Sequence, residues 1–416
     1  MRTFHTRKSL VAIATAALIF SIAPAIAAGN GQSQKPSWTT SLEKGCSPVT
    51  PNQDEATCHS WRVHTFINGQ EIDDAREFAD KVKALAGSTA TPAVPAGFTP
   101  SDLKSAYTVP APTGTPTIAI VDAFNSYATG SMLSDLNTYR SQFGLGAASL
   151  TIYNQAGAVW TPTNTSAFKS YRSNRGWDGE IALDIDMVSA ICQQCKIALV
   201  LAKSAYFSDL NAAVTTASKL PGVVAISNSY GGSDIAPSTY TAYSTESNNN
   251  LVVTASTGDN GYGVSAPASF TNVVAVGGTS LVMTSSGWNE SAWAGAGSGC
   301  SSQAANLRTS QTSVTACANK SNADISAVAD PSTGVSVYFG GWKVYGGTSA
   351  SAPIIASILG VYKSNGAFTG KALAYVWGRS WADVTSGSNG TCTPAIWCSA
   401  ARSTGWDGPT GLGTPR

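Results

Sequence analysis

Histidine is scarce in this chain and missing from most of it. The 416 residues contain only His5, His59 and His64, and none follows residue 64. A serine nucleophile usually depends on a neighbouring histidine as its general base. An ordinary Ser–His–Asp triad is therefore excluded unless the first 64 residues supply that base.

Charge is also low. Charged residues make up 12% of the chain, against about 25% in an average soluble domain. A surface rich in hydroxyl groups loses few ion pairs when the pH falls, which favours an acidic habitat. The whole chain has a formal charge of +1, and removing the signal described next, with three basic and no acidic residues, leaves −2. With no basic stripe and no polybasic tract, nucleic acid and anionic lipid are not expected partners.

Long apolar runs are missing after residue 28. Residues 1–28 have the form of a secretion signal, with a positive start, an apolar stretch over residues 10–20 and small residues at 25–27. The alternative is a membrane anchor, because the uncharged run over residues 9–28 could nearly span a bilayer. Pro24 and the small residues beside it favour cleavage. We therefore expect an extracellular protein with no membrane attachment once the signal is removed.

The eight cysteines fall into four local couples, which suggests disulfides in an oxidising compartment. The couples are Cys46 with Cys58, Cys192 with Cys195, Cys300 with Cys317, and Cys392 with Cys398. Pairing by proximity is one of many connectivities. A redox or zinc motif at residues 192–195 is the alternative, but a single CxxC without a second pair is a weak zinc signal.

Three parts are expected along the chain: the signal at 1–28, an N-terminal extension and linker at 29–95, and a main domain at 96–416. The extension contains a predicted helix at 73–85, and residues 88–95 are typical of a linker. In the main domain, apolar strands at 117–121, 196–201, 223–226, 251–255 and 273–276 alternate with helical patterns such as 133–143, 208–219 and 240–249. This alternation predicts an α/β fold with a mostly parallel sheet, whose functional loops lie at the carboxyl ends of the strands.

A candidate nucleophile lies in the sequence GTSASAP, where Ser349 would open a helix. Two preceding glycines allow the backbone to approach a substrate closely. The alternative is a simple helix cap, since serine and threonine favour that position.

Two further segments carry carboxylates. Glu180 and Asp184 are four residues apart and would share one helix face. That face could be solvated, but the stretch is mostly apolar, and two carboxylates in a partly buried site tend to share a proton and act as a base at acidic pH. Asp259 lies in STGDNG after a predicted strand. It could simply form a turn, or, if kept neutral, donate a hydrogen bond to an oxyanion.

These segments together resemble the sedolisin family, the serine-carboxyl peptidases with a subtilisin-like fold. The resemblance covers about residues 97–416 and includes AIVDAF, GEIALDIDMVSAIC, STGDNG, VVAVGGTSL, ADISAVADP, GGTSASAP and GWDGPTGLGTP. It implies Ser349 as nucleophile, Glu180 as general base, Asp184 as the residue that orients Glu180, and Asp259 as oxyanion donor. Asp122 stands where subtilisins carry their triad aspartate and would have a supporting role.

The resemblance also implies one structural calcium ion near the C-terminus. The matching ligands are the carboxylates of Asp383 and Asp407 and main-chain oxygens of Val384, Ser403 and Gly405. Oxygen ligands on loops suit calcium, whereas the alternative is a solvated, turn-rich tail.

We therefore expect a monomeric secreted endopeptidase that acts on protein or peptide substrates at acidic pH. One alternative is an inactive binding protein on a peptidase scaffold. Another is a neutral hydrolase using His59 or His64, which we expect to lie outside the main domain. The extension is short for this family, so it is either a reduced prosegment or evidence that none is needed.

Overall fold

The computed structural model describes residues 38–47, 54–86, 96–124, 129–171, 176–244, 250–305, 309–402 and 404–416. The expected signal at 1–28, the linker at 88–95 and the ligand Ser403 lie outside these residues. Of the helix expected at 240–249, residues 240–244 are described, and 242–244 of these are helical.

The core is an eight-stranded sheet with the order β12-β11-β10-β8-β5-β7-β6, to which β15 adds beside β11. Every pairing in it is parallel except that of β11 with β12. The strands are β5 (Thr117–Ala123), β6 (Leu150–Asn154), β7 (Lys196–Ala202), β8 (Val223–Asn228), β10 (Val252–Ser256), β11 (Val274–Thr284), β12 (Gly287–Ala292) and β15 (Ile325–Val328). The predicted mostly parallel sheet is confirmed.

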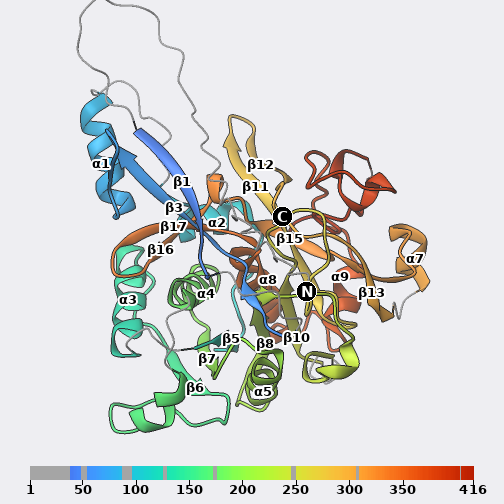
Figure 1. Ribbon diagram of the computed structural model, residues 1–416, viewed down its shortest axis with the longest axis horizontal. Coiled ribbons are helices and arrows are strands. Elements are labelled where there is room, and N and C mark those ends of the chain that lie inside the picture. The colour runs from blue at the N-terminus through green and yellow to red at the C-terminus, as the bar shows by residue number, and fades with distance from the viewer. Residues whose placement is uncertain are drawn as a thin grey trace, which may run out of the picture.

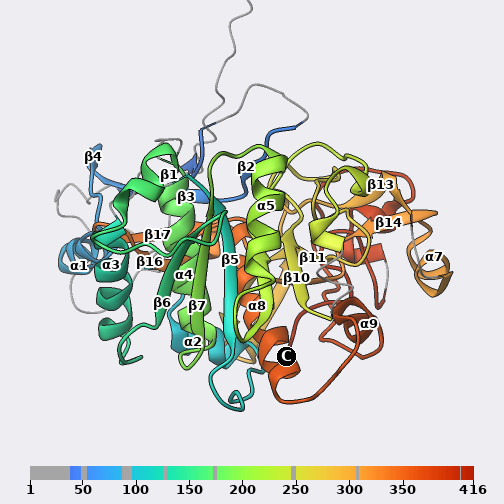
Figure 2. The same cartoon turned by 90° about the horizontal axis from the view of Figure 1, so that it is seen from below.

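Helices cover both faces of this sheet. Alternate residues of β5 point to opposite faces, so each set packs against different helices. Ile118 and Ile120 belong to a core shared with α4 (Trp177–Ile191) and α8 (Thr348–Ser364). Ala119 and Val121 belong to a second core shared with α5 (Phe207–Ala217). Figure 2 shows α5 in front of the strands with α4 and α8 behind them. The three-layer subtilisin-like architecture is therefore present.

A second, antiparallel sheet joins the extension to the main domain. It contains β1 (Trp38–Lys44), β3 (Trp61–Ile67), β4 (Gln70–Glu71), β16 (Val335–Tyr338) and β17 (Trp342–Gly346). β3 lies between β1 and β17, with Val63 opposite Val344. The extension therefore adds two long strands to a hairpin of the domain (Figure 1). Sequence reasoning expected only its helix, observed as α1 (Ala75–Ala86).

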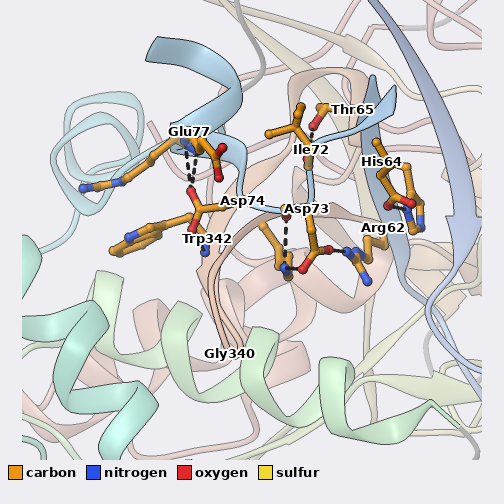
Figure 3. Close-up of polar contacts among 12 residues, drawn as sticks. Arg62, His64, Thr65, Ile72, Asp73, Asp74, Glu77, Gly340 and Trp342 are labelled. Carbon is orange, nitrogen blue, oxygen red and sulfur yellow. Dashed lines mark hydrogen bonds and ion pairs between the residues drawn. The ribbon is translucent and has the colours of Figure 1, made fainter. Parts of the chain in front are cut away.

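Two aspartates fasten the extension to that hairpin (Figure 3). Asp73 accepts from Lys343 Nζ at 2.5 Å and also pairs with Arg62. Asp74 Oδ2 accepts from the backbone N–H of Trp342 at 2.9 Å, while its Oδ1 accepts from two backbone N–H groups in the first turn of α1. Ion pairs, a helix cap and a strand ladder therefore act together at this junction.

Four further helices and two strand pairs lie around the two sheets. They are α2 (Pro100–Ala106), α3 (Thr129–Gln142), α7 (Thr309–Thr315), α9 (Ala372–Trp377), the strand pair β2 (Thr57–Cys58) with β9 (Tyr230–Gly231), and the pair β13 (Gly299–Ala305) with β14 (Asn319–Asn322). All four cysteine couples form disulfides in the arrangement predicted by proximity. None of the helices in the described ranges is long and apolar enough to cross a membrane.

The buried carboxylate of Glu290 on β12 gathers groups from both ends of the main domain. Its oxygens accept hydrogen bonds from Tyr107 Oη at 2.9 Å and from Thr279 Oγ1, Thr414 Oγ1 and Arg416 Nη2 at 2.7 Å each. Tyr107 lies directly after α2, near the start of the domain. Glu290 therefore joins the segment that opens the domain to the last residues of the chain.

Candidate active site

Ser349 lies in the first turn of α8 and is completely buried. Its Oγ donates to the carbonyl oxygen of Ser229 at 2.9 Å and accepts from the backbone N–H of His59 at 3.1 Å. The preceding Gly347 has φ 104°, a left-handed value that favours glycine. Thus the GTSASAP motif does open a helix, and Ser349 packs against a residue of the extension.

Three carboxylates share one closed pocket beside Ser349. Asp122 is near the carboxyl end of β5, and Glu180 and Asp184 are on α4; all three are fully buried. Within the described chain, no group meets their oxygens with ordinary hydrogen-bond geometry, although the hydroxyls of Ser349 and Ser60 are close enough to Glu180 to lower its pKa. The alternative of a solvated face for Glu180 and Asp184 is wrong, because both side chains are buried.

Burial and mutual repulsion determine how these groups titrate. Burial raises the pKa of Asp122 to about 8. The pKa of Glu180 lies well above its usual value because of burial and then the charge of Asp122. The pKa of Asp184 is raised by burial, then by Asp122 and Glu180. Because like charges this close cannot all ionise together, the three acids share protons over a wide pH range.

Asp259 follows β10 and faces the start of α8. Its Oδ1 accepts from the backbone N–H and the hydroxyl of Thr348, both at 2.8 Å. Its Oδ2 is buried, and no hydrogen-bond partner for it occurs among the described residues. Burial raises the pKa of Asp259 to about 7, against the hydrogen bonds from Thr348. In acid, Asp259 therefore carries a proton, and Oδ2 is the oxygen free to donate it.

His59 belongs to the extension, but its backbone contacts with Ser349 place it in this site. Its carbonyl oxygen accepts from the backbone N–H of Ser349 at 2.9 Å. Its imidazole Nδ1 contacts Ser256 Oγ at 2.8 Å and forms no hydrogen bond with the Ser349 hydroxyl. Burial, with a smaller contribution from Lys44, lowers the pKa of His59 to about 3. The imidazole is therefore neutral, but it contacts Ser256 and is not placed as a base for Ser349.

Sequence reasoning missed Ser229, whose carbonyl holds the Ser349 hydroxyl and whose own hydroxyl lowers the pKa of Asp184. It follows β8 directly, at the carboxyl end of a parallel strand. That position was the available signal, because Asp122 and Asp259 come from the corresponding ends of β5 and β10.

The C-terminal segment brings two of the predicted calcium ligands together. Asp383 Oδ2 accepts from the backbone N–H of Gly405 at 2.9 Å. The carboxylate of Asp407 accepts from the backbone N–H and hydroxyl of Thr410. Burial and, to a lesser extent, the charge of Asp383 raise the pKa of Asp407 to about 7, against the hydrogen bonds from Thr410. Two mutually repelling carboxylates are the kind of oxygen ligands that a hard cation prefers. In the part of the chain that is described, no cluster of three His, Cys, Asp or Glu side chains forms a metal site.

Fold and site together define a subtilisin-like α/β protein with a serine and buried carboxylates at the carboxyl edge of its sheet. Residues 170–391, more than half of the chain, match the Subtilase family (Peptidase_S8), and the chain belongs to that family. Kumamolisin from Bacillus sp. (strain MN-32) is 29% identical over 366 residues, which cover 78% of this chain and 63% of the relative. The chain thus spans less than two thirds of that curated relative.

Solved structures agree on the fold. Pseudomonas sedolisin, a serine-carboxyl proteinase solved with two molecules of pseudo-iodotyrostatin, superposes with a TM-score of 0.63 at 24% identity, covering 76% of this chain and 95% of the other. The S41 psychrophilic protease gives a TM-score of 0.50 at 16% identity over 76% of this chain and 97% of the other. The predicted subtilisin-like fold and the resemblance to sedolisins are confirmed.

Proposed function

We propose that this chain is a secreted serine-carboxyl endopeptidase that hydrolyses peptide bonds at acidic pH. The observation that carries the proposal is the cluster of three buried carboxylates beside Ser349, where no imidazole of the described residues hydrogen-bonds to the serine hydroxyl. Similarity to kumamolisin and to the sedolisin fold supports the same reaction class. The substrates would be proteins or peptides, bound in extended form along β9 on the edge that β2 occupies in this structure.

In the proposed reaction, Ser349 Oγ attacks the substrate carbonyl and gives its proton to Glu180. Asp184 keeps Glu180 in place and shares the charge of the pocket. The oxygen of the tetrahedral intermediate receives hydrogen bonds from the Ser349 backbone N–H and from protonated Asp259. Glu180 then passes the proton to the leaving nitrogen, and water releases the acyl group by the reverse sequence.

Asp122 would act on the base through charge. It is the strongest electrostatic influence on both Glu180 and Asp184 after burial. With Asp122 protonated, one proton can leave the Glu180–Asp184 pair without facing another negative charge. Because burial raises the pKa of both groups, only a small fraction of the pair is ionised in acid. That fraction is the base that we expect to act at about pH 3–5.

The alkaline limit should come from Asp259. Its pKa of about 7 means that the oxyanion donor is lost when the pH rises above that value. Hydrolysis of a denatured protein, measured from pH 3 to 8, should therefore fall as the pH passes 7. Undiminished turnover at pH 8 would argue against Asp259 as a protonated donor.

Substitutions test the residues directly. Ser349→Ala and Glu180→Gln should each abolish hydrolysis, whereas Ser357→Ala should retain it. Ser357 is a matched control because it is buried in the same helix, and its hydroxyl has no hydrogen-bond partner within the described residues. Parental activity in Glu180→Gln would disprove the assigned base. Failure of Ser349 to form an adduct with a peptide aldehyde would instead favour the inactive binding protein.

We also propose one structural calcium ion, held by the carboxylates of Asp383 and Asp407 and by oxygens of Val384, Ser403 and Gly405. A bound ion would relieve the repulsion between the two carboxylates and stabilise the folded state by mass action. A chelator should lower the melting temperature, and added calcium should restore it. The same chelator should have little effect on Asp383→Asn, and an unchanged melting temperature in the parent would exclude the ion.

Secretion and a monomeric state complete the proposal. The signal pattern at 1–28 and the four disulfides support an oxidising extracellular location. Fractionation of a cell culture and light scattering of the purified protein test these two points.

A further inference from the structure

A cavity of about 300 Å³ lies at the end of α4 that is remote from the proposed base. Glu180 is in the first turn of α4, whereas Ile191 ends this helix and lines the cavity. Eleven positions separate the two residues, which at a rise of 1.5 Å per residue is roughly 16 Å along the helix axis. The cavity is therefore a separate site, outside the cluster of buried carboxylates.

The walls of this cavity are mostly apolar. One side comes from α2 and the segment between α2 and β5, and the other comes from the end of α4 and the turn after it; α2 and α4 lie side by side in Figure 2. The side chains that define the cavity are Lys104, Val109, Pro110, Pro112, Ile191 and Gln193. A mostly apolar hollow with few polar groups is the usual form of a small-molecule site, and this volume is at the lower limit for one. The cavity therefore suits a ligand of about the size of one residue.

Both sides of the cavity are held in place by bonds within the protein. The turn after α4 is closed by the disulfide of residues 192–195. Arg140 holds the same turn, since its Nη2 donates to the carbonyl oxygen of Gln193 at 2.9 Å. On the facing segment, Asn365 Nδ2 donates to the carbonyl oxygen of Ala111 at 2.9 Å. A ligand would therefore order few additional groups, which keeps the entropic cost of binding low.

Lys104 brings a positive charge to these apolar walls. Its Nζ donates to the side-chain oxygen of Gln193 at 3.3 Å, a long hydrogen bond, and within the described chain no carboxylate pairs with it. Burial, followed by the charge of Arg140, lowers the pKa of Lys104. In acid the ammonium group is charged, half-buried and beside a second cation. A bound anion would supply the counterion that a partly buried charge favours.

Arg140 is that second cation, and its hydrogen bonds go to neutral oxygens. It donates to three carbonyl oxygens and one hydroxyl, those of Gly146, Leu145, Gln193 and Ser189. The acid that acts on Arg140 is Asp186, but burial raises the pKa of Asp186 well above its usual value, so this carboxyl is mostly protonated in acid. The carboxyl end of α4 opposes an anion with roughly half a negative charge. Two cations exceed that partial charge, and the cavity therefore favours one negative charge.

We propose that this cavity binds a carboxylate carried on a compact apolar group, with Lys104 as its counterion and the apolar walls around its side chain. The C-terminal residue of a peptide, such as leucine, has this chemistry, and a free branched carboxylic acid shares it. An α-carboxyl titrates at about pH 3.5, below a glutamate side chain at about 4.3, so a peptide end keeps its charge over most of the acidic range. The inference goes beyond the proposed function and does not depend on it, although peptide hydrolysis would release such ends.

Calorimetric titration with three small probes tests the ligand chemistry. The full-length protein carries Ser349→Ala, and the probes at pH 6 are N-acetyl-leucine, its uncharged amide and 4-methylpentanoate. We expect N-acetyl-leucine to bind at least tenfold more tightly than the amide, because only the acid can pair with Lys104. Equal affinities for the acid and the amide, or no binding of either acid, would overturn the proposal.

The third probe identifies the source of the carboxylate. 4-Methylpentanoate has the carboxylate and the leucine side chain without the amide group of a peptide. If it binds as well as N-acetyl-leucine, the carboxylate and the apolar group are sufficient, and a free carboxylic acid is a ligand. If it binds tenfold more weakly, the cavity also recognises the peptide group, and the ligand is a peptide end. Both results support the site.

A pair of substitutions tests the role of the lysine. Lys104→Met keeps a long apolar side chain and removes the charge, so it should weaken the binding of N-acetyl-leucine about tenfold and leave that of the amide unchanged. Lys219→Met is the matched control, because this lysine is exposed and follows α5 on the other face of the sheet. It should have no effect. Unchanged binding in Lys104→Met, or an equal loss in both variants, would contradict the assigned counterion.

Chemical protection locates the ligand without changing Lys104. Lysines of the folded protein are acetylated briefly with acetic anhydride at pH 7.5, with and without saturating N-acetyl-leucine, and the modified positions are quantified by mass spectrometry of peptides. We expect the ligand to slow the acetylation of Lys104 at least fivefold and to leave the exposed Lys196 and Lys219 unchanged. Equal acetylation of Lys104 with and without the ligand would show that the ligand binds elsewhere and would overturn the proposal.

Discussion

The buried carboxyl of Asp259 makes the stability of this protein depend on pH, and the effect can be isolated with one substitution. In Asp259→Asn, the amide oxygen can keep both hydrogen bonds from Thr348, and the amide nitrogen replaces Oδ2. The variant therefore preserves the shape of the site and removes only the ionisation. Both proteins should carry Ser349→Ala, so that hydrolysis by the candidate active site cannot disturb the measurement.

The size of the effect follows from the raised pKa of Asp259, about 7 in the folded state against 3.8 for the ordinary carboxyl. Because the folded-state pKa is the higher one, the contribution to stability is fully present below pH 3.8 and is lost as the pH rises toward 7. A shift of about three units corresponds to about 4 kcal/mol. Between pH 4 and 7, the parent should lose about that much more unfolding free energy than the Asn variant.

Urea unfolding at several pH values, followed by the fluorescence of the 11 tryptophans, measures this difference. Other titrating groups, including Asp122, Glu180 and Asp184, are present in both proteins and largely cancel in the comparison. The reasoning is refuted if the two curves of unfolding free energy against pH run parallel from pH 4 to 7. Such a result would mean that Asp259 is ionised in the folded protein well below neutrality.

Two substitutions, each with a matched control, test the structure outside the cluster of buried carboxylates. Lys320→Met breaks a buried ion pair with Asp324 at 2.6 Å and should lower the unfolding free energy in urea by about 3 kcal/mol. Lys81→Met, the control, breaks an exposed ion pair and should lower it by about 0.5 kcal/mol. Similar losses in the two variants would contradict the burial of the Lys320 pair. Gly297→Ala would place a methyl group 1.9 Å from a backbone oxygen of the STGDNG loop and should destabilise the fold by about 2 kcal/mol and lower kcat. Gly263→Ala, where there is room, should be neutral, and a neutral Gly297→Ala would show that the loop can yield.

The central sheet was readable from the sequence because its strands are buried on both faces. Runs such as TIAIV and KIALVL are apolar after their first residue, which is the signature of a parallel strand between two helix layers. The extension was harder to interpret. β3 reads WRVHTFI, a mixture of polar and apolar residues that suits a strand only once β17 and β1 lie on either side of it.

The site was predictable to the extent that its residues stand in local motifs. Ser349, Glu180 and Asp259 each lie in a short pattern at a helix start or after a strand. The position of His59 could not be inferred, because its contacts with Ser349 join residues 290 positions apart and rest on main-chain atoms, which every residue has. Its side chain, the one feature visible in the sequence, suggested a catalytic base. In the structure the imidazole contacts Ser256 and not the Ser349 hydroxyl.

The Glu290 cluster gives the main domain the topology of a closed ring. Fraying usually begins independently at the two ends of a domain, but here Tyr107 near one end and Arg416 at the other bond the same buried carboxylate. The backbone N–H of Thr108 also donates to the carbonyl of Pro415 at 2.7 Å. Opening either end therefore loosens the other, and a circular permutant that joins these ends and opens the exposed turn between β11 and β12 would preserve every one of these contacts.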